Sequence, residues 1–245
     1  MAGILEGIRV LDFGRYIAGP YCATILADLG AEVIRIEKVD GSEDRFNAPI
    51  SANGDCGATF AQMGRNKRGL TLNPRTQEGR KIVGELVKTA DVVVANLPPQ
   101  TLESMALDYE ALKAIKADII LTTNSAFGSG GPYSDRVGFD GIGQAMSGAM
   151  YLSGWPDQPQ KIYPPYVDFG TALYSALGTM AEALATRLVI LKKAATLAMS
   201  QMSRSSNPWA RSPSRSASSI SALARVILAA KSSIARWRSS NGATR

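Results

Sequence analysis

Residues 7–36 read GIRVLDFGRYIAGPYCATILADLGAEVIRI and predict a strand, a helix and a second strand in succession. The apolar runs at 8–11 and 33–36 lack the alternation of a strand with one solvated face, so we expect both strands to be buried on two faces. Pro20 suits the first turn of the helix and Gly30 suits its end. This order predicts a right-handed βαβ crossover.

The turn after the first strand lacks the glycine-rich fingerprint of dinucleotide-binding folds. Such folds need G-x-G-x-x-G at this turn, because the backbone there approaches a pyrophosphate closely. The turn here offers only Gly14 and Gly19. The sequence therefore argues against nicotinamide or flavin binding.

Three further segments are expected to extend the sheet. Residues 69–72 form a short strand candidate, and ADVVVAN at 90–96 and ADIILTT at 117–123 are continuous apolar runs typical of buried parallel strands. We expect an α/β fold with a Rossmann-like open, mostly parallel sheet and flanking helices. Asn96 ends one of these strands, at the edge where open α/β sheets place their ligand crevice.

Two helices between these strands carry start signals. Thr76 is predicted to cap a helix whose apolar residues fall on one face. Asp108 is predicted to cap a short helix that ends at Ile115. Both helices fit the connections that a parallel sheet requires.

Charge is distributed unevenly along the chain. Residues 1–190 carry 17 Lys and Arg against 21 Asp and Glu, whereas residues 191–245 carry 10 Lys and Arg and no acidic residue. The C-terminal part also contains 14 Ser and 11 Ala, and its apolar cluster at 226–228 is too small to offset the entropy of ordering it. We expect one α/β domain over 1–190 and a basic, disordered tail over 191–245.

Several classes of protein are disfavoured by composition. No segment is long and apolar enough to span a bilayer, and charged residues interrupt any signal-peptide core near the N-terminus, so a cytoplasmic location without membrane contact is expected. Cys22 and Cys56 give neither a disulfide framework nor metal spacing. The chain contains no histidine, so chemistry must use carboxylates, hydroxyls, lysines or backbone dipoles. We expect no metal and no permanently bound cofactor.

A family resemblance is carried by segments that occur in a fixed order. They are the opening βαβ stretch, GRNKRGLTLN (64–73), ADVVVANLPP (90–99), LDYEAL (107–112) and PPYVDFGTALYSALGTMA (164–181). Together they resemble the class III CoA-transferases, also called the CaiB/BaiF family, which includes formyl-CoA transferase, the carnitine CoA-transferases and α-methylacyl-CoA racemase. The resemblance runs to about Ala183 and fails after about Arg187.

The resemblance implies that Asp168 is the catalytic nucleophile. In the family an aspartate at this place attacks the acyl-CoA thioester and forms a mixed anhydride and free CoA thiolate. The thiolate returns to give an aspartyl-CoA thioester, from which an acceptor carboxylate takes the CoA. The implied partners are therefore an acyl-CoA substrate and a carboxylic acid. The residues alone favour another role for Asp168, the N-cap of a helix over 170–187.

The segment Gly138-Phe139-Asp140 bears on which branch of the family the chain resembles. The racemase branch has a histidine directly after this glycine. Phe139 stands in its place, which favours CoA transfer over racemisation.

The resemblance also implies a set of CoA-binding residues near the strand ends. As single charges, Lys38 and Arg75 are equally compatible with solvated surface positions, and Phe139 with a core position. Ser104 departs from the basic residue common at its place, which weakens one phosphate contact. The implied residues are Ile17 and Ala18 beside the pantetheine arm, Lys38 near a phosphate, Leu72 and Arg75 around the adenine and ribose, Asn96, Leu97 and Met105 along the cleft, and Phe139 and Asp140 near the thioester.

The C-terminal part departs from the family. Relatives continue into a linker with a Gly-Arg-Gly-Gln type turn and a second small domain whose loop closes over the site, and two chains interlock as a homodimer. We therefore expect a change of reading frame near codon 185, and a CoA-binding fragment without turnover is an open alternative. A second alternative is a genuine basic tail that contacts nucleic acid, with Trp209 and Trp237 available to stack on bases.

Overall fold

The computed structural model describes residues 3–47, 49–54 and 56–205, with side chains described as far as residue 187. The chain divides into two units, residues 1–186 and 187–245, whereas the sequence suggested a boundary after residue 190. The tail expected over 191–245 lies mostly in 206–245, outside the described residues. None of the described helices is both long and apolar enough to cross a membrane.

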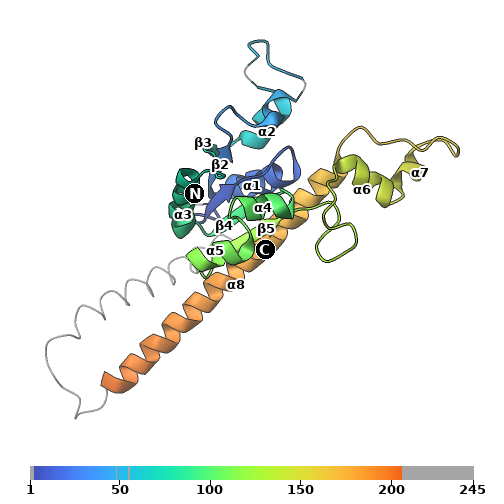
Figure 1. Cartoon of the computed structure of the whole chain (residues 1–245). Coiled ribbons are helices and arrows are strands. Elements are labelled where there is room, and N and C mark those ends of the chain that lie inside the picture. The colour runs from blue at the N-terminus through green and yellow to red at the C-terminus, as the bar shows by residue number, and fades with distance from the viewer. Residues whose placement is uncertain (1–2, 48, 55, 206–245) are drawn as a thin grey trace, which may run out of the picture. The chain divides into compact units, whose positions relative to one another are not determined.

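Five parallel strands form one sheet in the order β3-β2-β1-β4-β5 (Figure 1). This arrangement confirms the expected α/β fold, with β3 beginning slightly earlier than expected. The strand order reverses between β1 and β4, and such a switch point opens a crevice at the carboxyl ends of the strands. The strands are β1 (Arg9–Asp12), β2 (Glu32–Glu37), β3 (Lys67–Thr71), β4 (Val92–Ala95) and β5 (Ile120–Thr123).

Helices cover both faces of this sheet. Helix α1 and the beginning of α8 pack on one face, and α3, α4 and α5 pack on the other (Figure 1). The helices are α1 (Ala18–Asp28), α2 (Ala58–Gly64), α3 (Gln77–Thr89), α4 (Pro99–Ser104), α5 (Tyr109–Ile115), α6 (Asp140–Met146), α7 (Ala149–Ser153) and α8 (Tyr166–Ser205), with a short 3₁₀ helix η1 (Glu43–Phe46).

Alternate residues of the central strands supply two hydrophobic cores. Val10 packs in the core that includes Ala176 of α8, and its neighbour Leu11 packs in the core that includes Val87 of α3. All four side chains are almost inaccessible to solvent. Burying a valine or leucine side chain such as Val10, Leu11 or Val87 contributes roughly 1.5–3 kcal/mol to the stability of the fold. The two-sided burial predicted from the apolar runs is confirmed.

Both predicted helix caps are also present. The Thr76 hydroxyl accepts a hydrogen bond from the Gly79 N–H at 3.0 Å, and the Asp108 carboxylate accepts one from the Ala111 N–H at 3.0 Å. Each cap satisfies a helix N–H that has no partner within its own helix, a contribution of about 1 kcal/mol.

A buried cluster of charged side chains joins the three strands β1, β2 and β3. The Arg35 guanidinium lies 2.7 Å from Asp44, 3.6 Å from Glu37 and 3.7 Å from Asp12. The Lys67 ammonium lies 2.8 Å from Asp12. Burial opposes ionisation of Asp12, but the charges of Lys67 and Arg35 outweigh it and hold its pKa below the ordinary value.

The cluster generates a stability prediction. Arg35→Met leaves buried carboxylates without their partner, so we expect the free energy of unfolding to fall by about 3–5 kcal/mol. Arg68 is a matched control, because it pairs with Glu32 at 3.1 Å while its side chain is 79% exposed. Arg68→Met should cost less than about 1 kcal/mol. Urea denaturation followed by circular dichroism compares the two, and equal small losses would show that the cluster does not stabilise the sheet.

Candidate active site

A cleft at the carboxyl ends of the strands contains Asp168. It has a volume of about 150 Å³ and is bounded by α6, the start of α8 and the loops that follow β4 and β5. The structure brings several residues expected at the site together here, although they are far apart in the sequence. They are Ala18, Asn96, Leu97, Phe139, Asp140 and Asp168.

Asp168 lies in the first turn of α8, which begins at Tyr166. The prediction that Asp168 caps this helix is therefore wrong. The buried carboxylate of Asp140 fills that role from α6, because its Oδ2 atom accepts hydrogen bonds from the N–H groups of Val167 at 2.9 Å and Asp168 at 3.3 Å. Asp140, which we expect near the thioester, thus also fixes the backbone of Asp168, the expected nucleophile.

A second contact holds α6 against the segment that enters α8. The fully buried Gln144 amide donates to Asp140 Oδ1 at 2.5 Å and also bonds the N–H and carbonyl of Ile162, at 2.8 and 3.1 Å. The two helices approach so closely that a Cβ atom on Gly143 would lie 2.7 Å from Val167. The sequence interpretation missed Gln144, although its spacing of four residues from Asp140 places both on one helix face.

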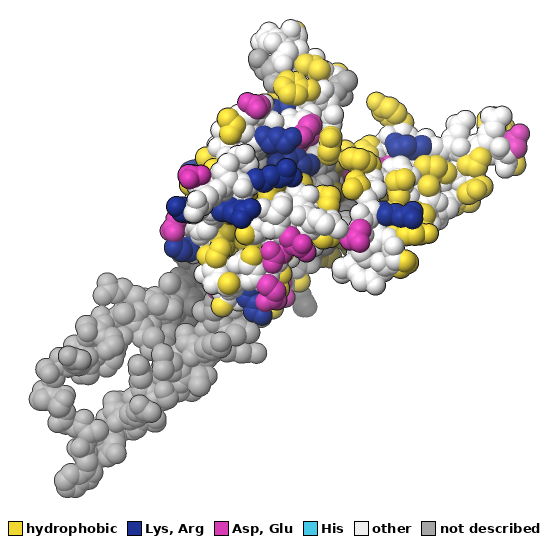
Figure 2. All heavy atoms as spheres, viewed as in Figure 1, with side chains coloured by type: hydrophobic (Ala, Val, Ile, Leu, Met, Phe, Trp, Pro, Cys, Tyr) yellow, Lys and Arg dark blue, Asp and Glu magenta, His cyan; other side chains and the backbone are white. Residues whose placement is uncertain are grey.

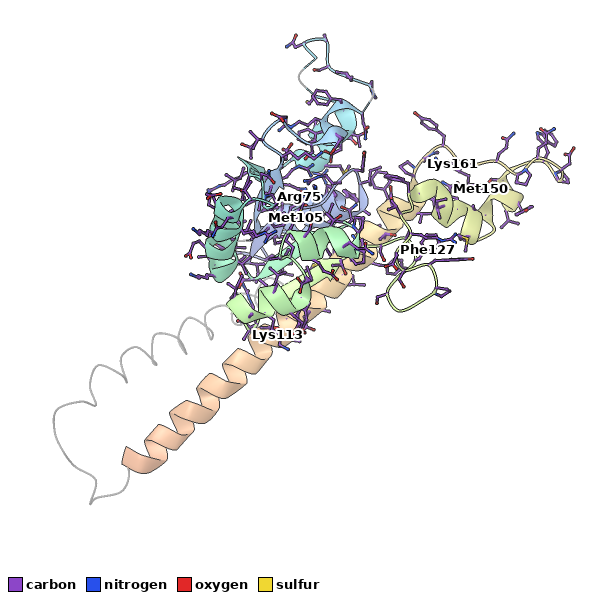
Figure 3. All side chains as sticks on the ribbon, viewed as in Figure 1. Arg75, Met105, Lys113, Phe127, Met150 and Lys161 are labelled. Carbon is purple, nitrogen blue, oxygen red and sulfur yellow. The ribbon has the colours of Figure 1, made fainter. Side chains whose placement is uncertain are left out.

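The charge of Asp168 is set by this environment. Burial and the negative charge of Asp140 raise the pKa of Asp168 to about 6, and Lys161 partly offsets them. Lys161 lies 3.9 Å from Asp140 and is labelled in Figure 3. The Asp168 carboxylate makes no hydrogen bond or ion pair with the described residues. Because its pKa is raised on folding, ionising Asp168 costs stability as the pH rises from 3.8 through about 6.

The turn between β1 and α1 lies beside the site, because it leads into Ala18 and its Tyr16 contacts Phe139, and both Ala18 and Phe139 line the cleft. Tyr16 has a left-handed backbone, φ 60°, which the Asp44 carboxylate holds by accepting its N–H at 2.9 Å. The Tyr16 ring meets Phe139 edge to face, with centroids 5.5 Å apart. Phe139 is 60% exposed, so the alternative that it is a core residue is wrong.

Asn96 anchors the same turn. Its Oδ1 atom accepts the Arg15 N–H at 2.6 Å and its Nδ2 atom donates to the Arg15 carbonyl at 2.8 Å. Both ends of the Asn96 amide are therefore engaged within the protein. Gly19 approaches the same amide, and a Cβ atom at this glycine would lie 2.8 Å from Asn96 Oδ1.

A second cleft of about 350 Å³ collects the residues expected around the adenine and phosphates. Arg75 and Met105 lie near each other in Figure 3, on a face where Figure 2 shows several Lys and Arg side chains. The Lys38 ammonium is paired with Glu43, whereas the Arg75 guanidinium forms no ion pair with the described residues. The expected residues that line this cleft are Lys38, Leu72, Arg75 and Met105.

Ile17 and Ser104, which the sequence also singled out, lie outside both clefts. Ile17 is the N-cap residue of α1 and directly precedes Ala18 of the first cleft. Ser104 lines a shallow recess with Arg75 and Arg80, and its carbonyl accepts a hydrogen bond from Arg80 at 2.7 Å. No cluster of His, Cys, Asp and Glu suited to a metal ion occurs in the part of the chain that the structure describes.

Comparison with known proteins identifies the family. The family model of CoA-transferase family III matches residues 5–205, and the chain belongs to this family. The match extends beyond Arg187, where the motif resemblance was expected to end. The crystal structure of a CAIB/BAIF family protein from Brucella suis has a TM-score of 0.73 and 38% identity, and the similarity covers 77% of this chain and 51% of that one.

Curated relatives have named activities. Succinate–glutarate CoA-transferase of Agrobacterium fabrum is 39% identical over 178 residues, which cover 70% of this chain and 44% of that protein. Succinyl-CoA–D-citramalate CoA-transferase of Chloroflexus aurantiacus is 37% identical over 177 residues, which cover 72% of this chain and 44% of that protein. The chain thus spans about half the length of the relatives that it matches.

Proposed function

We propose that this chain transfers CoA from an acyl-CoA thioester to a carboxylic acid, with Asp168 as the nucleophile. The observation that carries the proposal is a carboxylate with a raised pKa, free of ion pairs among the described residues, in the cleft at the switch point of the sheet. Such a group is mostly ionised at neutral pH and is not neutralised by a cation, as a nucleophile requires.

The proposed chemistry proceeds in two exchanges. An Asp168 oxygen bonds to the thioester carbonyl carbon, and the carbon–sulfur bond breaks to give a mixed anhydride and CoA thiolate. The thiolate then attacks the Asp168 carbonyl of the anhydride and releases the acyl group as a carboxylate. The acceptor carboxylate repeats the sequence in reverse and leaves as a new acyl-CoA. Covalent capture divides one difficult transfer into easier steps.

The two clefts support an assignment of the two ends of the substrate. The second cleft, which Lys38 and Arg75 line, suits the phosphates and adenine of CoA, and Arg75 forms no ion pair with the described residues. Phe13 and Arg15 of the turn anchored by Asn96 line this second cleft, and Ala18 and Asn96 line the first, where the thioester would meet Asp168. The Tyr16–Phe139 contact lies beside the first cleft and would help to exclude water, which would hydrolyse the anhydride.

The names of the relatives, together with Arg136, suggest a dicarboxylate acyl group. Both relatives described above are named for dicarboxylate transfer, and one for succinyl-CoA. Arg136 lines the Asp168 cleft, stacks on Tyr133 at 4.2 Å and forms no ion pair with the described residues. A guanidinium in this place can bind the second carboxylate of a succinyl group.

A CoA-binding fragment without turnover is the second candidate. It is favoured by the chain's span of about half the length of the relatives, whose remaining length has no counterpart in the match.

We also propose that the chain forms a homodimer. Tyr174 and Leu177 of α8 are 79% and 59% exposed, and such apolar surface is typical of an interface.

The nucleophile is tested by trapping the adduct. Incubation with succinyl-CoA and no acceptor should leave a covalent adduct on the Tyr166–Thr171 peptide that hydroxylamine removes, as measured by mass spectrometry. The rate should fall as the pH drops through about 6, because protonation removes the nucleophilic charge. Asp168→Asn should abolish the adduct, since an amide is a far poorer nucleophile.

The control for this experiment is Asp157→Asn, which changes an exposed carboxylate outside the cleft and should retain the adduct. CoA binding by titration without any adduct in the parent chain would favour the non-catalytic candidate. An adduct that persists in Asp168→Asn would assign the nucleophile elsewhere.

The acyl preference is tested at Arg136. Arg136→Gln should reduce adduct formation from succinyl-CoA about tenfold or more, because one charge-assisted hydrogen bond contributes roughly 1.5–3 kcal/mol. Adduct formation from butyryl-CoA, which lacks the second carboxylate, should change little. Equal losses for both thioesters would contradict a role in recognising the acyl group.

A further inference from the structure

Asn124 is a polar residue of the Asp168 cleft that the mechanism above does not use. It directly follows β5, and its Oδ1 atom accepts a hydrogen bond from the Ser175 hydroxyl of α8 at 2.5 Å. Its Nδ2 group is shielded from solvent and has no hydrogen-bond acceptor among the described residues. A buried donor without an acceptor is destabilising, because the hydrogen bonds that it would make with water are lost and not replaced. This cost calls for an explanation, and a ligand in the cleft supplies one.

Ser175, which bonds to Asn124, lies on the same helix as Asp168. Asp168, Thr171 and Ser175 are spaced three and four residues apart and therefore share one face of α8. Thr171 lines the cleft as Asp168 does. The hydrogen bond from Ser175 fixes the Oδ1 end of the Asn124 amide to this face, and the Nδ2 end keeps no partner among the described residues.

A second hydrogen bond ties β5 to α8 beside Asn124. The hydroxyls of Thr122 on β5 and Thr179 on α8 lie 2.6 Å apart, so strand and helix are joined a second time next to Asn124. The other amides at the site are already engaged, Asn96 with the Arg15 backbone and Gln144 with Ile162. Of the two described side-chain amides that line this cleft, Asn124 is the one whose nitrogen makes no hydrogen bond.

We infer that Asn124 Nδ2 donates a hydrogen bond to the carbonyl oxygen of the acyl thioester as Asp168 attacks it. This inference rests on the proposed function. When the Asp168 oxygen bonds to the carbonyl carbon, the π electron pair moves to the oxygen, and Nδ2 stabilises this oxyanion. The pair then re-forms the carbonyl, and the carbon–sulfur bond breaks with release of CoA thiolate. A fixed donor of this kind accelerates acyl transfer by about 10²–10³-fold.

The test uses the full chain with Asp168→Asn, which binds the thioester without consuming it. Succinyl-CoA labelled with ¹³C at the thioester carbonyl is the probe. We expect its ¹³C resonance to move downfield on binding, because a hydrogen bond polarises the carbonyl, and we expect Asn124→Leu to remove that shift. Leucine matches the shape of asparagine and lacks the donor. Thr123→Ala, an exposed neighbour outside the cleft, should preserve the shift.

Two further measurements separate the outcomes. Free CoA has no acyl carbonyl, so its affinity should change less than twofold in Asn124→Leu, whereas acylation of Asp168 in a chain that carries only this substitution should slow about 10²-fold. A bound thioester whose resonance is the same with and without the Asn124→Leu substitution would overturn this inference alone. A chain that binds no succinyl-CoA would overturn the proposed function and this inference together.

Discussion

The carboxylate of Asp140 at the N-terminus of α8 is the interaction on which the site depends. It accepts hydrogen bonds from the N–H groups of Val167 and Asp168, so the backbone of the proposed nucleophile is fixed by a side chain of another helix. The same negative charge helps to raise the pKa of Asp168. Burial and this one carboxylate therefore act together on the ionisation of the group proposed to react, and the carboxylate also fixes that group's backbone.

The turn between β1 and α1, beside the site, is held by the charged cluster that joins β1, β2 and β3. Asp44 pairs with Arg35 and also holds the N–H of Tyr16, a residue whose left-handed backbone costs of the order of 1–3 kcal/mol. Asn96 holds the turn from the other side. Asn96 directly follows β4 and Asp44 pairs with Arg35 of β2, so both anchors of the strained turn are tied to the sheet. The Tyr16 ring of this turn contacts Phe139, which lines the cleft that contains Asp168.

The sequence was most informative where local physics decides the structure. Apolar runs located the buried strands, and Thr76 and Asp108 were identified as caps because a cap acts within three residues of itself. Asn96 was predicted at this cleft because it ends a parallel strand, and Phe139 and Asp168 were predicted there from the family resemblance. Three features could not be predicted in this way: the capping of α8 by Asp140, the hydrogen bonds from Gln144 to Asp140 and Ile162, and the charged cluster around Arg35. Each joins elements whose relative placement is set only by the folded sheet. The orphaned Nδ2 of Asn124 likewise becomes visible only when its surroundings are packed.

The central claim, that Asp140 contributes to the raised pKa of Asp168, is tested most directly by titrating the Asp168 carboxyl carbon by ¹³C NMR in the parent chain and in Asp140→Asn. The account predicts a pKa of about 6 in the parent and a lower value in the variant, still above 3.8 because burial remains. A parent value near 3.8, or a variant value equal to the parent's in a chain that keeps its circular dichroism spectrum, would contradict it.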